Sequence, residues 1–283
     1  MSEISQPIQI KRILVSLDSS KHSYAALIAA LDLAERYSAK VKGIFVEDIN
    51  LLNLSKLPFH QEIGQYSAHV REISTDGITR GIIVQSRWVT RTFQRLITQK
   101  ELEGDISILR GHVSEMIFKE MKHFDLIILG KSGTKPLGRR KIGSTAGSLI
   151  LKQQKPLLLV EEGNQINQPI IVFYENSNAG KRSLETAADL VDESENLVIM
   201  IASASAKSLE DDKKFLKQWA EGKNIRLSFQ TYHPHRLDRT LFMLKGLKTG
   251  LFILPKSTDP KHQVILEHCL NMIDLPILLI QES

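Results

Sequence analysis

The residues with the clearest chemical meaning are glycines and hydroxyl side chains near the middle of the chain. Gly130 and Gly133 follow a short apolar run, and nine residues separate Gly133 from Gly143 and Ser144, which gives the pattern G-x2-G-x9-G-[ST]. Glycine permits positive φ and lets a backbone approach a ligand closely. A helix that begins at Ser144 would offer free N–H groups to an anion. The hydroxyls of Ser144 and Thr145 would add donors, so the pattern predicts a phosphate site.

The segment between these glycines is basic and contains no acidic residue. Such a run raises the local concentration of a polyanion. Each feature also has a structural reading, as turn glycines, a helix cap or a solvated loop, but their coincidence after one strand favours a ligand site. The five cations are Lys131, Lys135, Arg139, Arg140 and Lys141.

A carboxylate follows the first apolar run of the chain, in the sequence ILVSLDSS that ends at Ser20. In open α/β sheets, ligands bind outside the carboxyl ends of the strands at the topological switch point. If residues 13–17 and 126–129 form neighbouring strands, Asp18 and Gly130 face one crevice. Asp18 could then accept a hydrogen bond from a ribose hydroxyl. The alternative is that Asp18, Ser19 or Ser20 only caps the following helix.

Short apolar runs alternate with amphipathic stretches along the whole chain, which predicts an α/β fold with parallel sheets. Apolar residues at three- and four-residue spacing predict helices over residues 24–37, 113–121 and 144–151, and a longer one over 79–99. We expect Trp88, Phe93 and Leu96 of that longer helix to cover the sheet or a neighbouring domain. The expected strands are residues 13–17, 41–46, 106–109, 126–129, 157–160, 170–174, 197–201, 225–229, 251–254 and 277–280.

The second half of the chain repeats the first. DLIILGKS at residues 125–132 resembles GLFILPKS at 250–257, and KPLLLVEE at 155–162 resembles LPILLIQE at 275–282. We therefore expect two tandem doubly wound, Rossmann-like domains at residues 1–162 and 169–283, joined by the polar linker 161–168. The last strands of both copies are apolar and would otherwise be exposed edges. We expect them to pair within the chain and form a pseudo-dimer.

Taken in order, residues 13–20, 45–46, 110–111, 125–133, 143–144 and 155–160 resemble the universal stress protein family over residues 11–162. The resemblance implies a site for ATP, or for AMP or ADP, with Mg²⁺ or Mn²⁺ on the phosphates. It implies that Gly130, Gly133, Gly143 and Ser144 hold phosphates and ribose. Lys131, Ser132 and Thr145 lie within or beside this motif and complete the candidate phosphate site.

The resemblance also places three residues beside the nucleoside. Asp18 would lie near the ribose, and the backbone of Val46 and Ser16 would lie near adenine. In the second half Glu175 stands in place of Asp18, and Pro255 replaces Gly130. Proline lacks an N–H and fixes φ, so we expect that half to keep the fold and lose the site.

The resemblance implies nucleotide binding in a stress-response or regulatory role, with an unidentified protein partner, rather than rapid catalysis. Two alternatives stay open, a slow ATP hydrolase and a scaffold that binds no nucleotide. No G-x4-G-K-[ST] loop or first-turn G-x-G-x-x-G is present, which argues against a P-loop enzyme and a dinucleotide site. No catalytic residue or metal-ligand set is legible.

Charge and composition exclude other classes. Residues 1–163 hold 23 Lys and Arg against 17 Asp and Glu, and residues 164–283 hold 14 against 15. This excess suits a phosphate-bearing ligand and is too weak to predict nucleic-acid binding. No apolar run is long enough to span a membrane, and a homodimer through other surfaces stays open. Cys269 is the single cysteine, so no internal disulfide forms and we expect a cytoplasmic protein.

Overall fold

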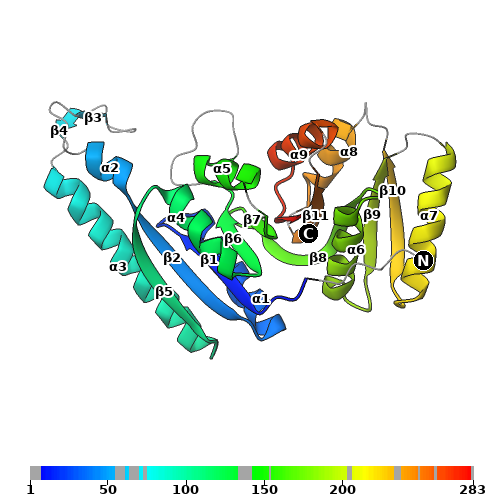
Figure 1. The fold of residues 1–283 in the computed structure, drawn as a ribbon, viewed down its shortest axis with the longest axis horizontal. Coiled ribbons are helices and arrows are strands. Elements are labelled where there is room, and N and C mark those ends of the chain that lie inside the picture. Colours follow the sequence, from blue (N-terminus) through cyan, green and yellow to red (C-terminus); the bar gives the residue numbers. More distant parts are fainter. Residues whose placement is uncertain are drawn as a thin grey trace.

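Ten strands form one continuous sheet that runs through both halves of the chain (Figure 1). The computed structural model describes residues 8–54, 61–63, 70–72, 75–132, 142–152, 154–202, 206–232, 237–247, 249–257 and 260–281. The strands of the first half are β1 (Arg12–Leu17), β2 (Lys40–Asp48), β5 (Gly104–Gly111), β6 (Leu126–Gly130) and β7 (Leu157–Val160). Those of the second half are β8 (Gln165–Tyr174), β9 (Asn196–Ala202), β10 (Arg226–Tyr232), β11 (Thr249–Lys256) and β12 (Ile277–Gln281).

The strand order is the same in both halves. Across the sheet it reads β10-β9-β8-β11-β12-β7-β6-β1-β2-β5. Numbered within its own half, each copy has the order 3-2-1-4-5, and all neighbours inside a copy are parallel. Each of the ten strands expected from an apolar run is present, so the α/β class and the repeated topology are confirmed.

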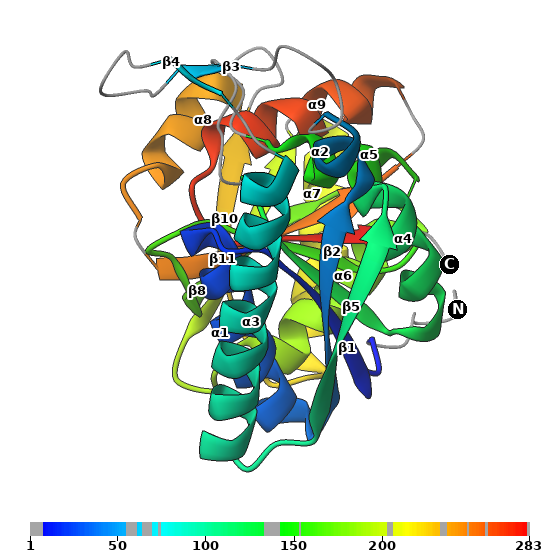
Figure 2. The same ribbon diagram turned by 90° about the vertical axis from the view of Figure 1, so that its left-hand side faces the viewer.

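Helices cover both faces of the sheet (Figures 1 and 2). One hydrophobic cluster joins the sheet to α1, α3, α6 and α7, and a second cluster on the other face joins it to α4, α5, α8 and α9. No helix among the described residues is long and apolar enough to cross a membrane. The helices are α1 (Lys21–Tyr37), α2 (Ile49–Leu54), α3 (Thr75–Gln99), α4 (Val113–Glu120), α5 (Ser144–Lys152), α6 (Asn178–Leu190), α7 (Ala206–Glu221), α8 (Leu237–Leu244) and α9 (Pro260–Met272), with a 3-10 turn η1 (Met121–His123).

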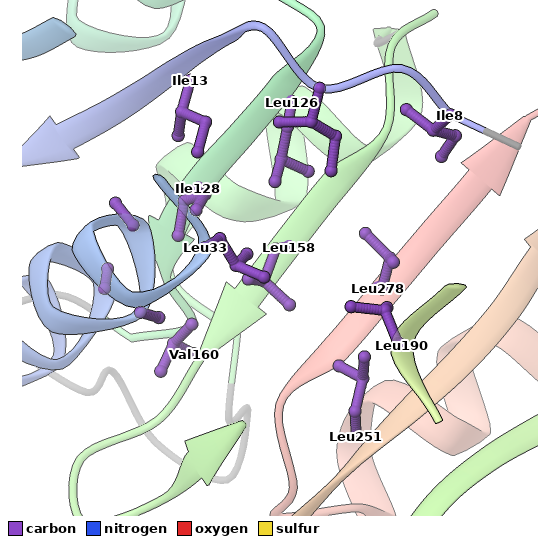
Figure 3. Close-up of a cluster of buried hydrophobic side chains, with 14 of the residues drawn as sticks. Ile8, Ile13, Leu33, Leu126, Ile128, Leu158, Val160, Leu190, Leu251 and Leu278 are labelled. Carbon is purple, nitrogen blue, oxygen red and sulfur yellow. The ribbon is translucent and has the colours of Figure 1, made fainter. Parts of the chain in front are cut away.

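The two halves meet where β7 and β12 pair antiparallel at the centre of the sheet. Leu158 lies opposite Leu278, between the pairs Leu157–Leu279 and Leu159–Ile277. All of these side chains are buried. Figure 3 shows Leu158 and Leu278 facing a common apolar cluster to which Leu33 of α1 and Leu190 of α6 also belong. The expected intrachain pairing is therefore confirmed.

Two lysines at equivalent positions of the repeat join the halves further. Lys131 Nζ donates to the carbonyl oxygen of Ile273, at 2.5 Å, just beyond the C-terminus of α9. Lys256 Nζ donates to the carbonyl oxygen of Ile150, at 2.6 Å, in the last turn of α5. Cations are favourable at helix C-termini, where carbonyl groups lack partners. The lysine of each half thus binds the last helix of the other half.

Two expectations from the sequence are corrected. The linker is shorter than residues 161–168, because β8 already begins at Gln165. Ile166 packs against the core between two exposed residues, which is strand-like alternation within a polar stretch. In the long helix, Phe93 is buried on the sheet as expected, but Trp88 lies at the surface and is 47% exposed. The extension also includes a small antiparallel pair, β3 (Gln61–Ile63) with β4 (Val70–Glu72).

Candidate functional site

A cavity of about 540 Å³ lies at the carboxyl ends of β1, β2 and β6. β1 has β2 on one side and β6 on the other, so the chain reverses its direction of progress across the sheet at β1. This is the switch point at which open α/β sheets bind ligands. Asp18 and Gly130, which follow and end two neighbouring strands, both line the cavity. The crevice expected from the sequence is therefore present.

Hydrogen bonds at the end of β1 show which residue caps α1. Ser20 is the N-cap of α1, because its side chain accepts from the Ser23 N–H at 3.1 Å. The Asp18 backbone is tied to the Ser23 hydroxyl. Asp18 Oδ1 accepts from the Ser20 N–H at 2.8 Å, whereas Oδ2 has no hydrogen-bond partner among the described residues. Ser20 therefore takes the capping role, and one Asp18 oxygen remains available.

The end of β2 borders the cavity from the other side. The β1–β2 pairing stops at Leu17 and Phe45, while the β2–β5 pairing continues to Asp48 and Gly111. β2 therefore extends beyond the end of β1. Val46, the first residue of β2 after its pairing with β1 ends, lines the cavity. Ser16, one residue before the end of β1, also lines the cavity.

Gly130 is required by close packing rather than by a left-handed backbone. A Cβ at this position would lie 3.0 Å from the carbonyl carbon of His22 and 3.0 Å from the nitrogen of Ser23. No positive φ occurs at Gly130, so the turn geometry expected from the sequence is corrected. Its missing side chain lets β6 approach the first turn of α1. This closeness brings the end of β6 and the Asp18 loop to the same cavity.

The N-terminus of α5 also borders the cavity. The Gly143 N–H donates to the Lys131 carbonyl at 2.9 Å, and the first intrahelical bond is donated by Gly147. The N–H groups of Ser144, Thr145 and Ala146 come before that bond, so they have no partner within the helix. These residues line the cavity together with Ser132 and Gly143. N–H groups without a partner in the helix, together with the helix dipole, favour an anion at such a position.

Not every predicted site residue reaches the cavity. The Lys131 side chain is fully buried and points to the second half of the chain, where its ammonium binds Ile273 and lies 3.5 Å from Glu161 Oε2. Its backbone carbonyl, rather than its charge, supports the site. Gly133 and the cations Lys135, Arg139, Arg140 and Lys141 lie outside the described residues.

The lining residues that the sequence did not single out as site residues include Asp48, Leu51, Gln85 and Val113. Asp48 ends β2 as Asp18 follows β1, so its position after an apolar run was a usable signal. Gln85 comes from α3, and nothing in the sequence placed that helix beside the glycine motif. The described lining holds two carboxylates, Asp18 and Asp48, and contains no lysine or histidine. No three His, Cys, Asp or Glu of the described residues are grouped to hold a metal ion.

At the equivalent place in the second half, the carboxylate is engaged by side chains of the protein itself. Glu175, in the position of Asp18, accepts from the Ser177 hydroxyl at 2.8 Å, and its other oxygen contacts His262 Nε2 of α9. Pro255, in the position of Gly130, lies in β11 and pairs with Ile280. Glu175, the counterpart of Asp18, is thus in contact with a side chain of α9. In this copy α9 is the counterpart of α5, whose N-terminus borders the cavity of the first half.

Comparisons with known proteins agree with this architecture. The sequence profile of the Universal stress protein family matches residues 9–161, more than half of the chain. The Universal stress protein MJ0531 of Methanocaldococcus jannaschii is 26% identical over 152 residues, covering 54% of this chain and 82% of that protein. The Stress response protein NhaX of Bacillus subtilis is 25% identical over 161 residues, covering 53% and 97%. A crystal structure of a universal stress protein from Archaeoglobus fulgidus matches the fold over 98% of both chains, with a TM-score of 0.70 and 15% identity.

Proposed function

The chain belongs to the universal stress protein family, and from that premise we propose that its first half binds an adenine nucleotide, foremost ATP, in a stress-response role. The observation that carries the proposal is the convergence of three features on one cavity. These are the free Asp18 oxygen, the closely packed Gly130 and the N–H groups at the start of α5. The cavity volume of about 540 Å³ lies within the range of ordinary small-molecule sites.

Each part of the nucleotide has a matching group. The phosphates sit at the first turn of α5, where Ser144 and Thr145 offer N–H and hydroxyl donors to negative charge. The ribose lies at Asp18, whose Oδ2 accepts a hydroxyl hydrogen bond. The adenine edge lies against the backbone at Val46 and Ser16, at the point where β2 extends past β1.

A divalent cation would bind through the phosphates. Two carboxylates, Asp18 and Asp48, line the cavity, which is fewer protein ligands than Ca²⁺ sites use but typical of Mg²⁺ held mainly by substrate phosphates and water. The protein groups would then orient the ion and would not form a site for it alone. Nucleotide affinity should accordingly depend on Mg²⁺ or Mn²⁺, while affinity for the free metal should be weak.

We assign the site to a domain of residues 1–162 and a supporting role to a domain of residues 169–283. In the second copy Glu175, the counterpart of Asp18, contacts Ser177 and His262 instead of standing free for a ribose hydroxyl. A different universal stress protein, 15% identical over 54% of this chain, has been solved in complex with cAMP. That result concerns that protein, and the proposal for this chain rests on its own cavity.

The experiment is a calorimetric titration of the full chain with Mg-ATP, compared with the variant Ser144→Asp. Ser144 is the exposed first residue of α5. An aspartate there suits the helix dipole and preserves the fold, but it places a negative charge beside the phosphates. At about 5 Å and an effective dielectric of 20, the repulsion is about 3 kcal/mol per phosphate charge, so we expect at least a tenfold loss of affinity.

The matched control is Asn178→Asp, the same change of charge at the exposed first residue of α6 in the second half. It should bind ATP as the unmodified chain does. Equal affinity in both variants would contradict the site assignment, and no binding by any form would favour the scaffold function. Phosphate release on the order of 10 per second would instead indicate an ATP hydrolase.

A further inference from the structure

Helix α3 is fixed on the sheet at the outer end of the first half (Figures 1 and 2). Its inner face is apolar and buried through Ile82, Val89, Phe93 and Ile97. Phe93 sits against two glycines of the sheet, since a Cβ at Gly43 would lie 3.0 Å from its ring and one at Gly104 would lie 3.4 Å from it. This packing fixes which side of the helix faces outward.

The outward face of α3 carries four exposed arginines, Arg80, Arg87, Arg91 and Arg95. They recur at spacings of seven, four and four, which at 3.6 residues per turn places them within an arc of about 80°. The strip is about 22 Å long, from a rise of 1.5 Å per residue. Among the described residues, none of these arginines makes an ion pair or a side-chain hydrogen bond.

None of the acidic side chains that the structure describes beside α3 is paired with the strip. The single acidic residue of α3 is Asp76 in its first turn. At the other end of the helix, Asp32 and Glu35 of α1 are bound to Lys100, at 3.0 and 2.8 Å. On the neighbouring strand β5, Asp105 is paired with Lys42. The positive charge of the α3 strip is therefore available to an external partner.

Large apolar side chains stand on the same face. Val84 lies within the arginine strip and is 64% exposed, and Trp88 lies at its border and is 47% exposed. Ile83, on the opposite border, is also exposed. Clustered basic side chains are attracted to a membrane surface that carries anionic lipid, and tryptophan prefers the headgroup level.

We propose that the outer face of α3 binds peripherally to a membrane surface that contains anionic phospholipid. The arginines contact lipid phosphates, and Val84 and Trp88 enter the headgroup boundary. A second copy of the chain is disfavoured as the occupant, because two such faces would place arginine against arginine. A nucleic acid would use the arginines but would gain nothing from Val84 or Ile83, whereas a membrane uses both sets.

The test is sedimentation of the full chain with vesicles of phosphatidylglycerol and phosphatidylcholine, against vesicles of phosphatidylcholine alone. One basic side chain near an anionic surface strengthens binding about fivefold. Four arginines thus predict a preference of several hundredfold for the anionic vesicles, and added salt should reduce it. The double variant Arg87→Gln/Arg91→Gln should bind about 25-fold more weakly and keep its circular dichroism spectrum, since both side chains are exposed.

The matched control is Lys214→Gln/Lys217→Gln, which removes two exposed charges from α7 in the second half. It should bind as the unmodified chain does. Tryptophan emission should shift to the blue on anionic vesicles, and the shift should disappear in Trp88→Phe. Absent vesicle binding, equal loss in both double variants, or a shift that persists without Trp88 would overturn the proposal. Tighter binding to duplex or single-stranded DNA, lost in the arginine variant, would overturn it in favour of nucleic acid.

Discussion

Replacing Lys131 with methionine keeps the aliphatic stem and deletes the ammonium group that joins the two halves. The ammonium is fully buried, donates to the Ile273 carbonyl at 2.5 Å and lies 3.5 Å from Glu161 Oε2. The lysine is adjacent to Gly130, and its own carbonyl holds the Gly143 N–H. The substitution therefore tests the contact between the halves without altering the backbone of the candidate site.

The expected loss of unfolding free energy follows from these contacts. A hydrogen bond to a charged group contributes about 1.5–3 kcal/mol. Breaking a buried ion pair costs about 3–5 kcal/mol, but the Glu161 side chain is 22% exposed and keeps contact with water. Methionine also removes the cost of burying a charge. We expect Lys131→Met to destabilise the chain by about 2 kcal/mol, and Lys256→Met, which breaks the half-buried counterpart, by less.

The assay is urea unfolding, with hydrogen exchange to locate the change. Lys21→Met is the matched control, because Lys21 pairs with Glu162 at 3.0 Å but is 81% exposed, and such pairs contribute less than about 1 kcal/mol. Exchange should rise at Leu157–Leu159 of β7 and stay unchanged in β10, at the far end of the sheet. A loss no larger than that of Lys21→Met would refute the assignment of Lys131 to the contact between the halves.

Two further predictions concern the second half. Leu278→Pro deletes an N–H of β12 beside its antiparallel partner Leu158, so hydrogen exchange of residues 157–159 should accelerate in a chain that light scattering shows to be monomeric; unchanged exchange would contradict intrachain pairing. Burial raises the pKa of the Cys269 thiol to about 12. Because the thiolate is the reactive form, a disulfide reagent at pH 8 should label Cys269 only after unfolding. Rapid labelling of the folded chain would show that α9 is packed differently.

The strands were predictable because apolar runs bounded by polar residues are a strong signal in a sheet buried on both faces. Their ends were less so. β8 starts five residues before the apolar run at Ile170, since only Ile166 of its first part packs inward. The orientation of Trp88 could not be predicted either, because a helix with apolar residues on two faces does not reveal which face meets the sheet.

The candidate site was predictable at residues whose type and position favour one role. The Asp18 carboxylate, Gly130 and the start of α5 are brought together as expected. The basic residues around Lys131 favour a position for it at the phosphates, yet its side chain contacts Ile273 in the other half of the chain. The repeat in the sequence already indicated a structural role for this lysine, because Lys256 occupies the equivalent position in a copy without the glycines. A lysine kept without the site belongs to the fold.

The most direct test of the central claim is the stoichiometry of nucleotide binding. Titration of the full chain with Mg-ATP, with the protein concentration fixed by amino-acid analysis, should give one site per chain. One site is expected because the first half offers the free oxygen of Asp18 and the start of α5, while Glu175 of the second half is bound to Ser177 and His262. A value of two would show that the second copy is functional, and a value of zero would contradict nucleotide binding altogether.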